Sequence, residues 1–456
     1  MKENLENLDL QFWKWFPQGI KNPSKINYYL NQRSDWLDHK IINRFEELEL
    51  HKNFGLFAIG GYGKKEIFPA SDIDISIIQI NSKHDNYEKL EIFIAFLWDF
   101  GHKVGHSVRT KNDIKKIITS DVKEFTSYLT FRPLSANTKS IEILKDVLKN
   151  KEKIFTINKF FTKKKNEQNE RYKSFDSTEF NLEPDLKESP GSLRDYQTAS
   201  WILNHCFKIS SDAEIKKSNF FNAQELASIN NAYDFIKLLR YSINLLQTSS
   251  RNRLNFNTQI ELAKKSKIPP SKAKQSVEKL MQMYYFNAEK LSIFNETVFD
   301  KYEEKSFFSL TRSYGDFFIK NNRIGFNQLD LRNHKNLIFE IFVKIGQRKD
   351  LTHIDTSTAR ILKENIHLID AEFKNNHKYS QQFLNILKSP YNLSSILRKM
   401  KRLGIIQAYI SEFSEVIGQM QFDLFHVYTV DEHTFKVVRN MRQMKINQLG
   451  DGFEIE

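Results

Sequence analysis

The feature that most constrains the fold of this chain is a pair of short apolar segments joined through glycines. Residues 55–59 (GLFAI) form an apolar run typical of a buried strand, and Gly60 and Gly61 follow it directly. Residues 72–80 (DIDISIIQI) alternate in polarity, as a strand with one buried face does. Two strands joined through a glycine turn and a short connection predict the start of a mixed sheet.

Two helices and a third strand complete this N-terminal region. Apolar residues at helical spacing predict a helix over 26–48, and we expect a second helix over 87–100 and a strand over 104–110. Together with the first two strands, these elements form a compact α/β unit that we expect to end near Asn137.

Strand signals nearly vanish beyond this unit. Residues 160–187 are polar and contain proline, which predicts irregular structure. Pro269 and Pro270 stand where the first turn of a helix tolerates them, and Gly404 and Gly418 are expected breaks. Helical periodicity is found over four segments, 193–207, 223–247, 276–295 and 335–444.

The sequence therefore predicts the α+β class, with a small mixed sheet and its helices followed by a mainly helical portion. At roughly 150 residues per domain, 456 residues suggest two to four domains, and an apolar fraction of 40% is ample for packed cores. We expect three domains, with bounds 1–137, 138–330 and 331–456.

Composition limits the functional classes. Lys and Arg outnumber Asp and Glu by 69 to 56, but this excess of +13 is spread over the whole chain, so nucleic acid is not expected as a partner. Cys206 is the sole cysteine and cannot form an internal disulfide, which favours a reducing compartment. The N-terminus lacks a signal-peptide pattern, and no apolar run approaches the roughly 20 residues that span a bilayer. We expect a cytoplasmic protein with no membrane partner.

Two aspartates open the second predicted strand. Because side chains two apart in a strand point to the same face, Asp72 and Asp74 project together, while Ile73 and Ile75 point to the other side. Adjacent carboxylates repel each other unless a cation lies between them, and a hard divalent ion, Mg²⁺ or alternatively Mn²⁺, fits oxygen ligands. We therefore predict that Asp72 and Asp74 are both metal ligands and catalytic residues.

The glycine turn suits a phosphate-binding role. Gly60 and Gly61 let the backbone approach a polyphosphate closely, and Lys64 and Lys65 add positive charge. A triphosphate across this turn, with its metal on the aspartates, would undergo nucleotidyl transfer. The alternative is a plain turn before a solvated strand edge. A Walker or dinucleotide-binding loop fits poorly, because GGYGKK (60–65) lacks both the G-K-[ST] ending and the G-x-G-x-x-G spacing.

These residues also resemble a known family. The string GGYGKKEIFPASDID (60–74) is similar to the nucleotidyltransferase signature of bacterial PII-protein uridylyltransferase/uridylyl-removing enzymes, which modify the PII signalling protein in nitrogen regulation. Four further segments are similar to family segments in the same order: WDFGHKVGHSVRT (98–110), FNLEPDLKESPGSLRDYQTASWI (180–202), RNRLNFNTQIELA (251–263) and IGQMQFDLFHVYTVDEHTFKVVRNM (417–441). The resemblance covers nearly the whole chain, up to about Met441.

The resemblance implies transfer of UMP from UTP to a tyrosine of a PII protein, with release of pyrophosphate. It makes 1–137 the nucleotidyltransferase domain, 138–330 an associated helical domain, and 331–456 a helical linker with the truncated start of an HD-type phosphohydrolase domain. Asp72 and Asp74 match the family's metal-binding aspartates. The nucleotide-binding candidates are Gly60, Gly61, Lys64, Ser71 and Arg109.

The third predicted strand has no carboxylate, although nucleotidyltransferases of this superfamily often place one there. Asp99 and Asp113 flank the strand, but neither can be placed in the site, so the general base is unassigned. Alternation puts Ser107 and Arg109 on one face and His106 on the other. For Arg109, a phosphate contact and a structural salt bridge both remain open, whereas His106 fits a core histidine.

A second cluster follows a Pro-Gly turn at residues 190–191. Arg194 could reach the nucleotide, and Asp195 would complement the dipole of a helix that starts there. The alternative, which we favour, is a structural turn with a capped helix. Ser189 and Ser192 stand where the family usually shows glycine.

The resemblance makes HVYTVDEHT (426–434) the opening of the phosphohydrolase domain. His433 matches its first histidine, but no later His-Asp pair follows in this sequence, so we expect an incomplete metal site. This chain alone would then lack uridylyl-removing activity, and it would lack the family's glutamine-sensing domains.

Two other functions remain open. The first is a nucleotidyltransferase with a different acceptor, either glutamine synthetase or an RNA end. The second is a non-catalytic remnant that only binds PII or a nucleotide.

Overall fold

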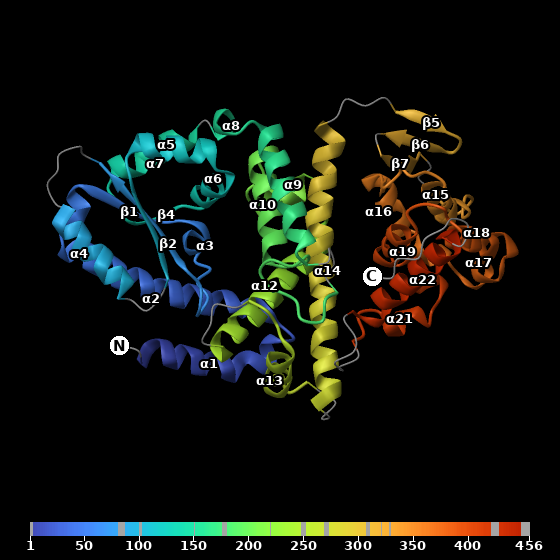
Figure 1. Cartoon of the computed structure of the whole chain (residues 1–456), viewed down its shortest axis with the longest axis horizontal. Coiled ribbons are helices and arrows are strands. Elements are labelled where there is room, and N and C mark those ends of the chain that lie inside the picture. The colour runs from blue at the N-terminus through green and yellow to red at the C-terminus, as the bar shows by residue number, and fades with distance from the viewer. Residues whose placement is uncertain are drawn as a thin grey trace. The chain divides into compact units, whose positions relative to one another are not determined.

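The computed structural model divides the chain into two compact units, Met1–Phe299 and Asp300–Glu456 (Figure 1). The predicted boundary after 137 falls inside the first unit and that after 330 inside the second, so the division into three domains stays a prediction. The described residues are 3–80, 87–99, 103–149, 151–175, 180–218, 220–247, 252–268, 273–306, 311–320, 322–327, 330–420 and 428–447.

The first unit contains the predicted mixed sheet. Its strands are β1 (Phe54–Ala58), β2 (Ile73–Gln79), β3 (Val104–Arg109) and β4 (Arg132–Ser135), in the order β3-β2-β1-β4. Strand β2 runs antiparallel to β1 and parallel to β3, and β4 is antiparallel to β1. The first three strands confirm the strands predicted from the sequence.

Helices cover both faces of this sheet (Figure 1). Ile73, Ile75 and Ile77 are fully buried on one face, where they join a core with side chains of α2 (Ile26–Glu47) and α4 (Tyr87–Trp98). Each such side chain contributes roughly 1.5–3 kcal/mol through burial. The other face of β2 carries Asp74 and Ser76. The helices on that side are α5 (Lys111–Ser120), α6 (Val122–Tyr128) and α7 (Thr138–Lys149).

Helices make up the rest of the first unit, and the segments predicted as helical at 193–207, 223–247 and 276–295 are confirmed. Pro269 and Pro270 lie outside the described residues. The helices are α1 (Glu3–Gly19), α3 (Gly60–Gly63), α8 (Lys151–Ile154), α9 (Ile157–Lys173), α10 (Leu193–Phe207), α11 (Asp212–Lys217), α12 (Ala223–Leu246), α13 (Phe256–Ser266) and α14 (Ala273–Ser306), with short 3-10 turns at Pro23–Lys25 and Leu50–Lys52.

The prediction of irregular structure over 160–187 is wrong for its first half, because α9 continues to Lys173. The inward side of α9 includes Phe160 and Phe161 but also the buried polar side chains Lys164 and Gln168. Apolar periodicity therefore breaks off along a helix whose polar residues are mostly good helix formers.

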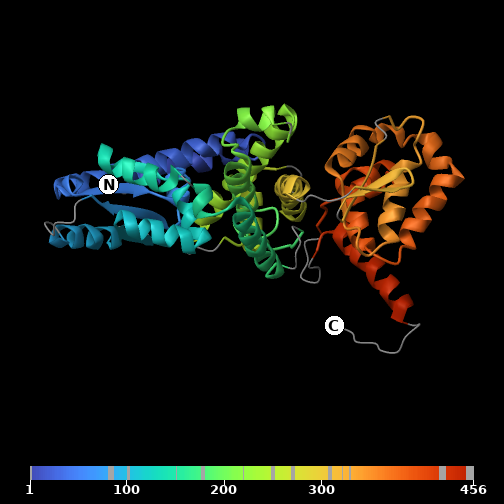
Figure 2. The ribbon, with the colours of Figure 1, turned by 90° about the horizontal axis from the view of Figure 1, so that it is seen from above.

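The second unit contains a second small sheet that the sequence analysis missed. Its strands are only two to four residues long, too short to produce a visible alternation of polarity. Figure 2 shows the helices of this unit, in orange and red, packed about these strands. The strands are β5 (Arg312–Tyr314), β6 (Phe317–Lys320), β7 (Arg323–Phe326) and β8 (His353–Ile354), in the order β5-β6-β7-β8.

Helical structure in the rest of the second unit agrees with the predicted periodicity. Gly404 and Gly418 have φ values of +81° and +61°, which confirms both as breaks. No helix in the described ranges is long and apolar enough to cross a bilayer. The helices are α15 (Leu337–Gly346), α16 (Thr356–Glu364), α17 (Ala371–Asn375), α18 (His377–Leu387), α19 (Leu393–Arg402), α20 (Ile405–Tyr409), α21 (Phe413–Val416) and α22 (Val430–Asn447), with a 3-10 turn at Ile366–Leu368.

Candidate active site

A cavity of about 740 Å³ lies in the first unit between the sheet and the helices that follow it. Four of its residues come from the predicted glycine turn and strand start, Gly60, Gly61, Asp72 and Asp74. Lys64 and Ser71 line it as well. Further positive side chains line the cavity that sequence reasoning did not connect with this site: Lys123 of α6, and Lys164, Arg171, Lys187 and Arg240 of the helical part.

Asp72 and Asp74 project into this cavity as strand geometry predicts. Burial raises the pKa of Asp74, and the nearby charges of Asp72 and Glu124 raise it further, whereas Lys187 lowers it. A raised pKa means that the ionised carboxylate lacks sufficient positive charge nearby. A divalent cation would supply that charge, so the pair fits a metal ion.

The two carboxylates would be only part of a metal's ligand shell. Among the described residues, no group of three or more His, Cys, Asp or Glu side chains could hold a metal ion. Mg²⁺ is commonly bound by one or two carboxylates together with substrate phosphates and water. The donor set therefore fits a metal that arrives with a phosphate ligand.

Two glycines leave room for the Asp74 carboxylate. A Cβ on Gly60, which has φ +58°, would lie 3.1 Å from Asp74 Oδ2, and a Cβ on Gly105 would lie 2.8 Å from Asp74 Oδ1. Gly105 is paired with Asp74 across β2 and β3. Sequence reasoning missed Gly105, although a glycine inside a strand often marks a close approach of this kind.

Of the two lysines predicted to add positive charge beside the glycine turn, Lys64 lines the cavity and Lys65 does not. Lys64 lines the cavity, and its pKa is lowered by burial, then by the charges of Lys237 and Arg194, with Glu66 opposing. Lys65 instead lies 2.5 Å from the Asp35 carboxylate on α2 and does not line the cavity. The Ser71 hydroxyl hydrogen-bonds the Phe68 backbone within the loop before Asp72.

The arrangement does not support a nucleotide-binding role for Arg109. Its Nη1 is 2.7 Å from Glu124 Oε2 and donates to the Tyr128 hydroxyl at 3.1 Å, and Arg109 is absent from the described cavity lining. Arg109 pairs with Ile78, four residues along β2 from Asp74, so the strand carries it away from the aspartates. Of the two alternatives for Arg109, the structure shows the salt bridge, which is formed with Glu124.

The flanking carboxylates also lie outside this lining. Thr110 is the N-cap of α5, and Asp113 completes the capping box by accepting hydrogen bonds from the Thr110 hydroxyl at 2.7 Å and the Thr110 backbone N–H at 3.0 Å. Asp99 follows the end of α4. His106 is half-buried, and its ring lies 5.9 Å from the ring of Trp98, which is 64% exposed, so His106 does not take the core position expected for it. The general base remains unassigned.

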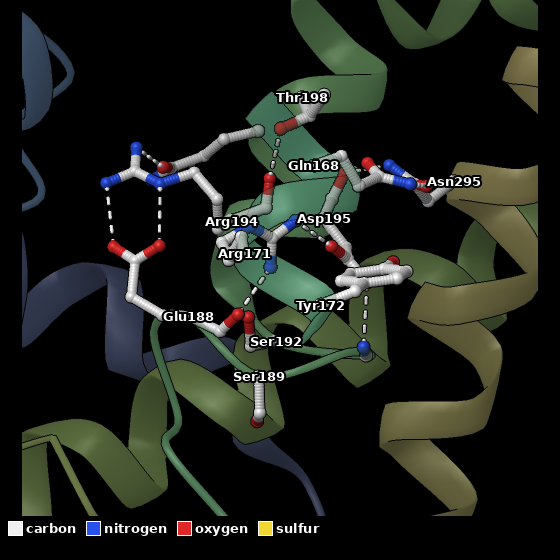
Figure 3. A network of polar contacts seen from close by, with 12 residues as sticks. Gln168, Arg171, Tyr172, Glu188, Ser189, Ser192, Arg194, Asp195, Thr198 and Asn295 are labelled. Carbon is white, nitrogen blue, oxygen red and sulfur yellow. Dashed lines mark hydrogen bonds and ion pairs between the residues drawn. The ribbon is translucent and has the colours of Figure 1, made fainter. Parts of the chain in front are cut away.

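The cluster after the Pro-Gly turn divides between structure and site (Figure 3). Asp195 lies in the first turn of α10 and is fully buried; it accepts hydrogen bonds from Arg171 Nη2 at 2.5 Å, the Tyr172 hydroxyl at 2.6 Å and Gly191 N at 2.7 Å. Arg194 points to the cavity and pairs with Glu188 at 3.0 Å. The structural turn is therefore confirmed, and Arg194 lies where it could meet a nucleotide.

His433 lies on α22 in the second unit. The two residues before it are buried and paired with cations of α19: Asp431 with Lys401 at 3.0 Å, and Glu432 with Arg398. The predicted role of His433 in a phosphohydrolase site stays a prediction.

Comparisons with known proteins identify the family. Residues 159–299 match the family model described as "GlnD PII-uridylyltransferase", and residues 317–409 match the one described as "Uridylyltransferase GlnD third domain". These two regions of the chain belong to the PII-uridylyltransferase family. The second match begins with β6 and ends with α20, so it covers three strands of the second sheet, β6, β7 and β8, and the helices from α15 to α20.

Relatives of the family resemble the chain over almost all of its length. The Acinetobacter baumannii (strain ACICU) relative is 30% identical over 97% of this chain and 51% of its own length. The Hydrogenovibrio crunogenus relative is 32% identical over 93% of this chain and 49% of its own length. Both are named bifunctional uridylyltransferase/uridylyl-removing enzyme. The chain thus spans about half the length of the curated relatives it matches.

Proposed function

We propose that this chain transfers UMP from UTP to a tyrosine of a PII signal-transduction protein, in nitrogen regulation in the cytoplasm, using Mg²⁺ or Mn²⁺. The observation that carries the proposal is one cavity in which a carboxylate pair, Asp72 and Asp74, faces a group of cations. In this cavity the pKa of Asp74 is raised and that of Lys64 is lowered, so the charged form of each side chain is unfavourable. A metal-bound polyphosphate would stabilise both charged forms, because the metal is positive and the phosphates are negative. The names of the relatives and of the matching family model support the uridylyl group and PII.

In the proposed reaction the tyrosine oxygen forms a bond to the α-phosphorus of UTP, and the bond between that phosphorus and the pyrophosphate oxygen breaks. Asp72 and Asp74 would hold the metal. A metal bound there would stabilise the negative charge that develops on the phosphates during transfer. Lys64 and Arg194 contribute positive charge to the same cavity. The phenol proton leaves to a base that is not assigned.

A transfer assay tests the proposal. With UTP labelled at the α-phosphate, Mg²⁺ and a PII protein, the chain is expected to label PII, and a PII variant with phenylalanine at the acceptor tyrosine should stay unlabelled. Chelation of the metal should stop the reaction. A folded chain that transfers no label with either Mg²⁺ or Mn²⁺ would show that the proposal is wrong.

Replacement of Gly105 by alanine is expected to slow the transfer about 10- to 100-fold, because the added Cβ would displace the Asp74 carboxylate. The kcat for UMP transfer measures this effect, and a thermal melt checks that Gly105→Ala is folded. A Gly105→Ala protein with wild-type kcat would mean that the position of the Asp74 carboxylate is not important.

The relatives' names also include uridylyl removal. For this chain, the absence of that activity remains a prediction. Loss of label from uridylylated PII during incubation with the chain would contradict it.

A further inference from the structure

The helical part of the first unit places a buried arginine in the cavity wall, where none of the described carboxylates forms an ion pair with it. Arg240 on α12 has 8% of its surface exposed and lines the cavity. Its Nε donates to Asn252 Oδ1 at 2.8 Å, and its guanidinium lies 4.1 Å from the centre of the Phe68 ring. Within the described ranges, no carboxylate forms an ion pair with it. A buried charge without a counter-ion is unfavourable, which points to an anion that the cavity is built to receive.

The electrostatic surroundings of Arg240 agree with this. Burial, together with the charge of Arg194, lowers the pKa of Arg240 to about 10, and the charges of Asp185 and Glu66 only partly oppose this shift. A guanidinium normally stays protonated far above this range. The side chain is thus held in surroundings that lack negative charge.

Lys187 adds a second cation to the same wall. Burial lowers its pKa, and the charges of Arg240 and Arg194 lower it further. Its nearest carboxylate, Glu188, is 4.0 Å away and is already hydrogen-bonded to Arg194. Asp72 contributes the weakest of the resolved effects on this lysine. Lys187 is therefore near enough to Asp72 to be affected by its charge, but no described carboxylate lies closer to Lys187 than 4.0 Å.

The backbone around these two cations is fixed. Asn252 accepts the Arg240 hydrogen bond with its side chain and accepts a hydrogen bond from Leu186 N with its backbone oxygen, at 2.9 Å. On the other side of Lys187, Arg171 donates to the Glu188 carbonyl at 2.5 Å and is itself held by Asp195 (Figure 3). This bracing keeps Lys187 and Arg240 near each other in spite of their repulsion, so the cation pair is formed before a ligand arrives.

We infer that Arg240 and Lys187 form a diphosphate subsite, which holds the β- and γ-phosphates of the nucleoside triphosphate and then the pyrophosphate that leaves. The inference rests on the proposed nucleotidyl transfer and extends it. The α-phosphate would lie at the metal on Asp72 and Asp74, while Arg240 and Lys187, which line the same cavity, bind the leaving group. Arginine suits this role because its planar donors match phosphate oxygens.

Calorimetric titration of the full chain with pyrophosphate, in the presence of Mg²⁺, tests the subsite. Arg240→Gln and Lys187→Met are each expected to weaken pyrophosphate binding on the order of 10- to 100-fold, the usual effect of losing a charged hydrogen bond. Arg240→Lys should recover part of the loss. The matched control Arg332→Gln removes the same charge from a side chain of the second unit that is 74% exposed, and it should bind as the wild type does.

Two readouts separate a binding role from a structural one. Pyrophosphate should raise the melting temperature of the wild type and of Arg332→Gln, and should raise that of Arg240→Gln much less. If Arg240→Gln does not fold, Lys187→Met decides the question, because Lys187 lies in the turn before α10 and its replacement leaves the packing of α12 unchanged. Wild-type pyrophosphate affinity in a folded Arg240→Gln or Lys187→Met, or no pyrophosphate binding by the wild type, would overturn the inference.

The outcomes also separate this inference from the proposed function. Pyrophosphate binding that depends on Arg240, in a chain that transfers no UMP to PII, would remove the proposed function and keep the subsite. Transfer of UMP to PII by the wild type, together with unchanged pyrophosphate affinity in Arg240→Gln and Lys187→Met, would support the proposed function and reject the subsite.

Discussion

Replacement of Asp74 by asparagine is expected to reduce UMP transfer by at least ~10²–10³-fold, since the metal would lose one of its two protein carboxylates. The same variant should melt at a higher temperature than the wild type at pH 7 when no metal is present. The reason is that burial and the charge of Asp72 raise the pKa of Asp74, so its ionised form is unfavourable in the folded protein. Asparagine has nearly the same shape and carries no charge.

The stability effect has a defined pH dependence. Because the folded-state pKa of Asp74 lies above the unfolded value, its favourable contribution is complete below the unfolded pKa and is lost as the pH rises through the folded pKa. The advantage of Asp74→Asn should therefore disappear in acid, where both side chains are neutral. Melting curves between acidic and neutral pH measure this.

Two controls accompany this prediction. Asp99→Asn removes an exposed carboxylate that does not line the cavity, and neither its activity nor its melting temperature should change much. Mg²⁺ should raise the melting temperature of the wild type more than that of Asp74→Asn. Full activity of Asp74→Asn, or a lower melting temperature at pH 7 than in the wild type, would contradict the assignment of Asp74.

Replacement of Asp195 by alanine is expected to lower the free energy of unfolding of the first unit by about 3–5 kcal/mol, the cost of removing one partner of a buried ion pair. The substitution leaves the buried Arg171 guanidinium without its carboxylate and removes the acceptor for Tyr172 and for Gly191 N. Asp195→Asn keeps an acceptor oxygen and should cost less. Urea unfolding followed by circular dichroism provides the measurement.

The matched control for Asp195→Ala is Glu261→Ala on α13. Glu261 belongs to an exposed pair with Lys264 at 3.1 Å, and such pairs contribute about 0–1 kcal/mol. Equal destabilisation by Glu261→Ala and Asp195→Ala would mean that the network in Figure 3 does not hold α9 and α10 together.

The sheet and its aspartates could be predicted because their signals are local. The run before Gly60 and the alternation from Asp72 specify strand, turn and face within about twenty-five residues. The second sheet could not be predicted, because strands as short as His353–Ile354 acquire their structure from pairing with neighbours. Helix α9 was missed from residue 160 onward for a related reason, since Lys164 and Gln168 are buried polar residues at positions where periodicity requires apolar ones.

The sequence by itself determined the mixed sheet, the glycine turn, the carboxylate pair and, through its ordered segments, the family resemblance. Only the tertiary structure decided which cations face that pair. Arg109 is much closer to Asp74 in the sequence than Arg240 is, but the strand direction carries Arg109 to Glu124, whereas Arg240 lines the cavity. The physical reason is that alternation along a strand is fixed by backbone geometry, while the meeting of distant charges depends on how helices pack.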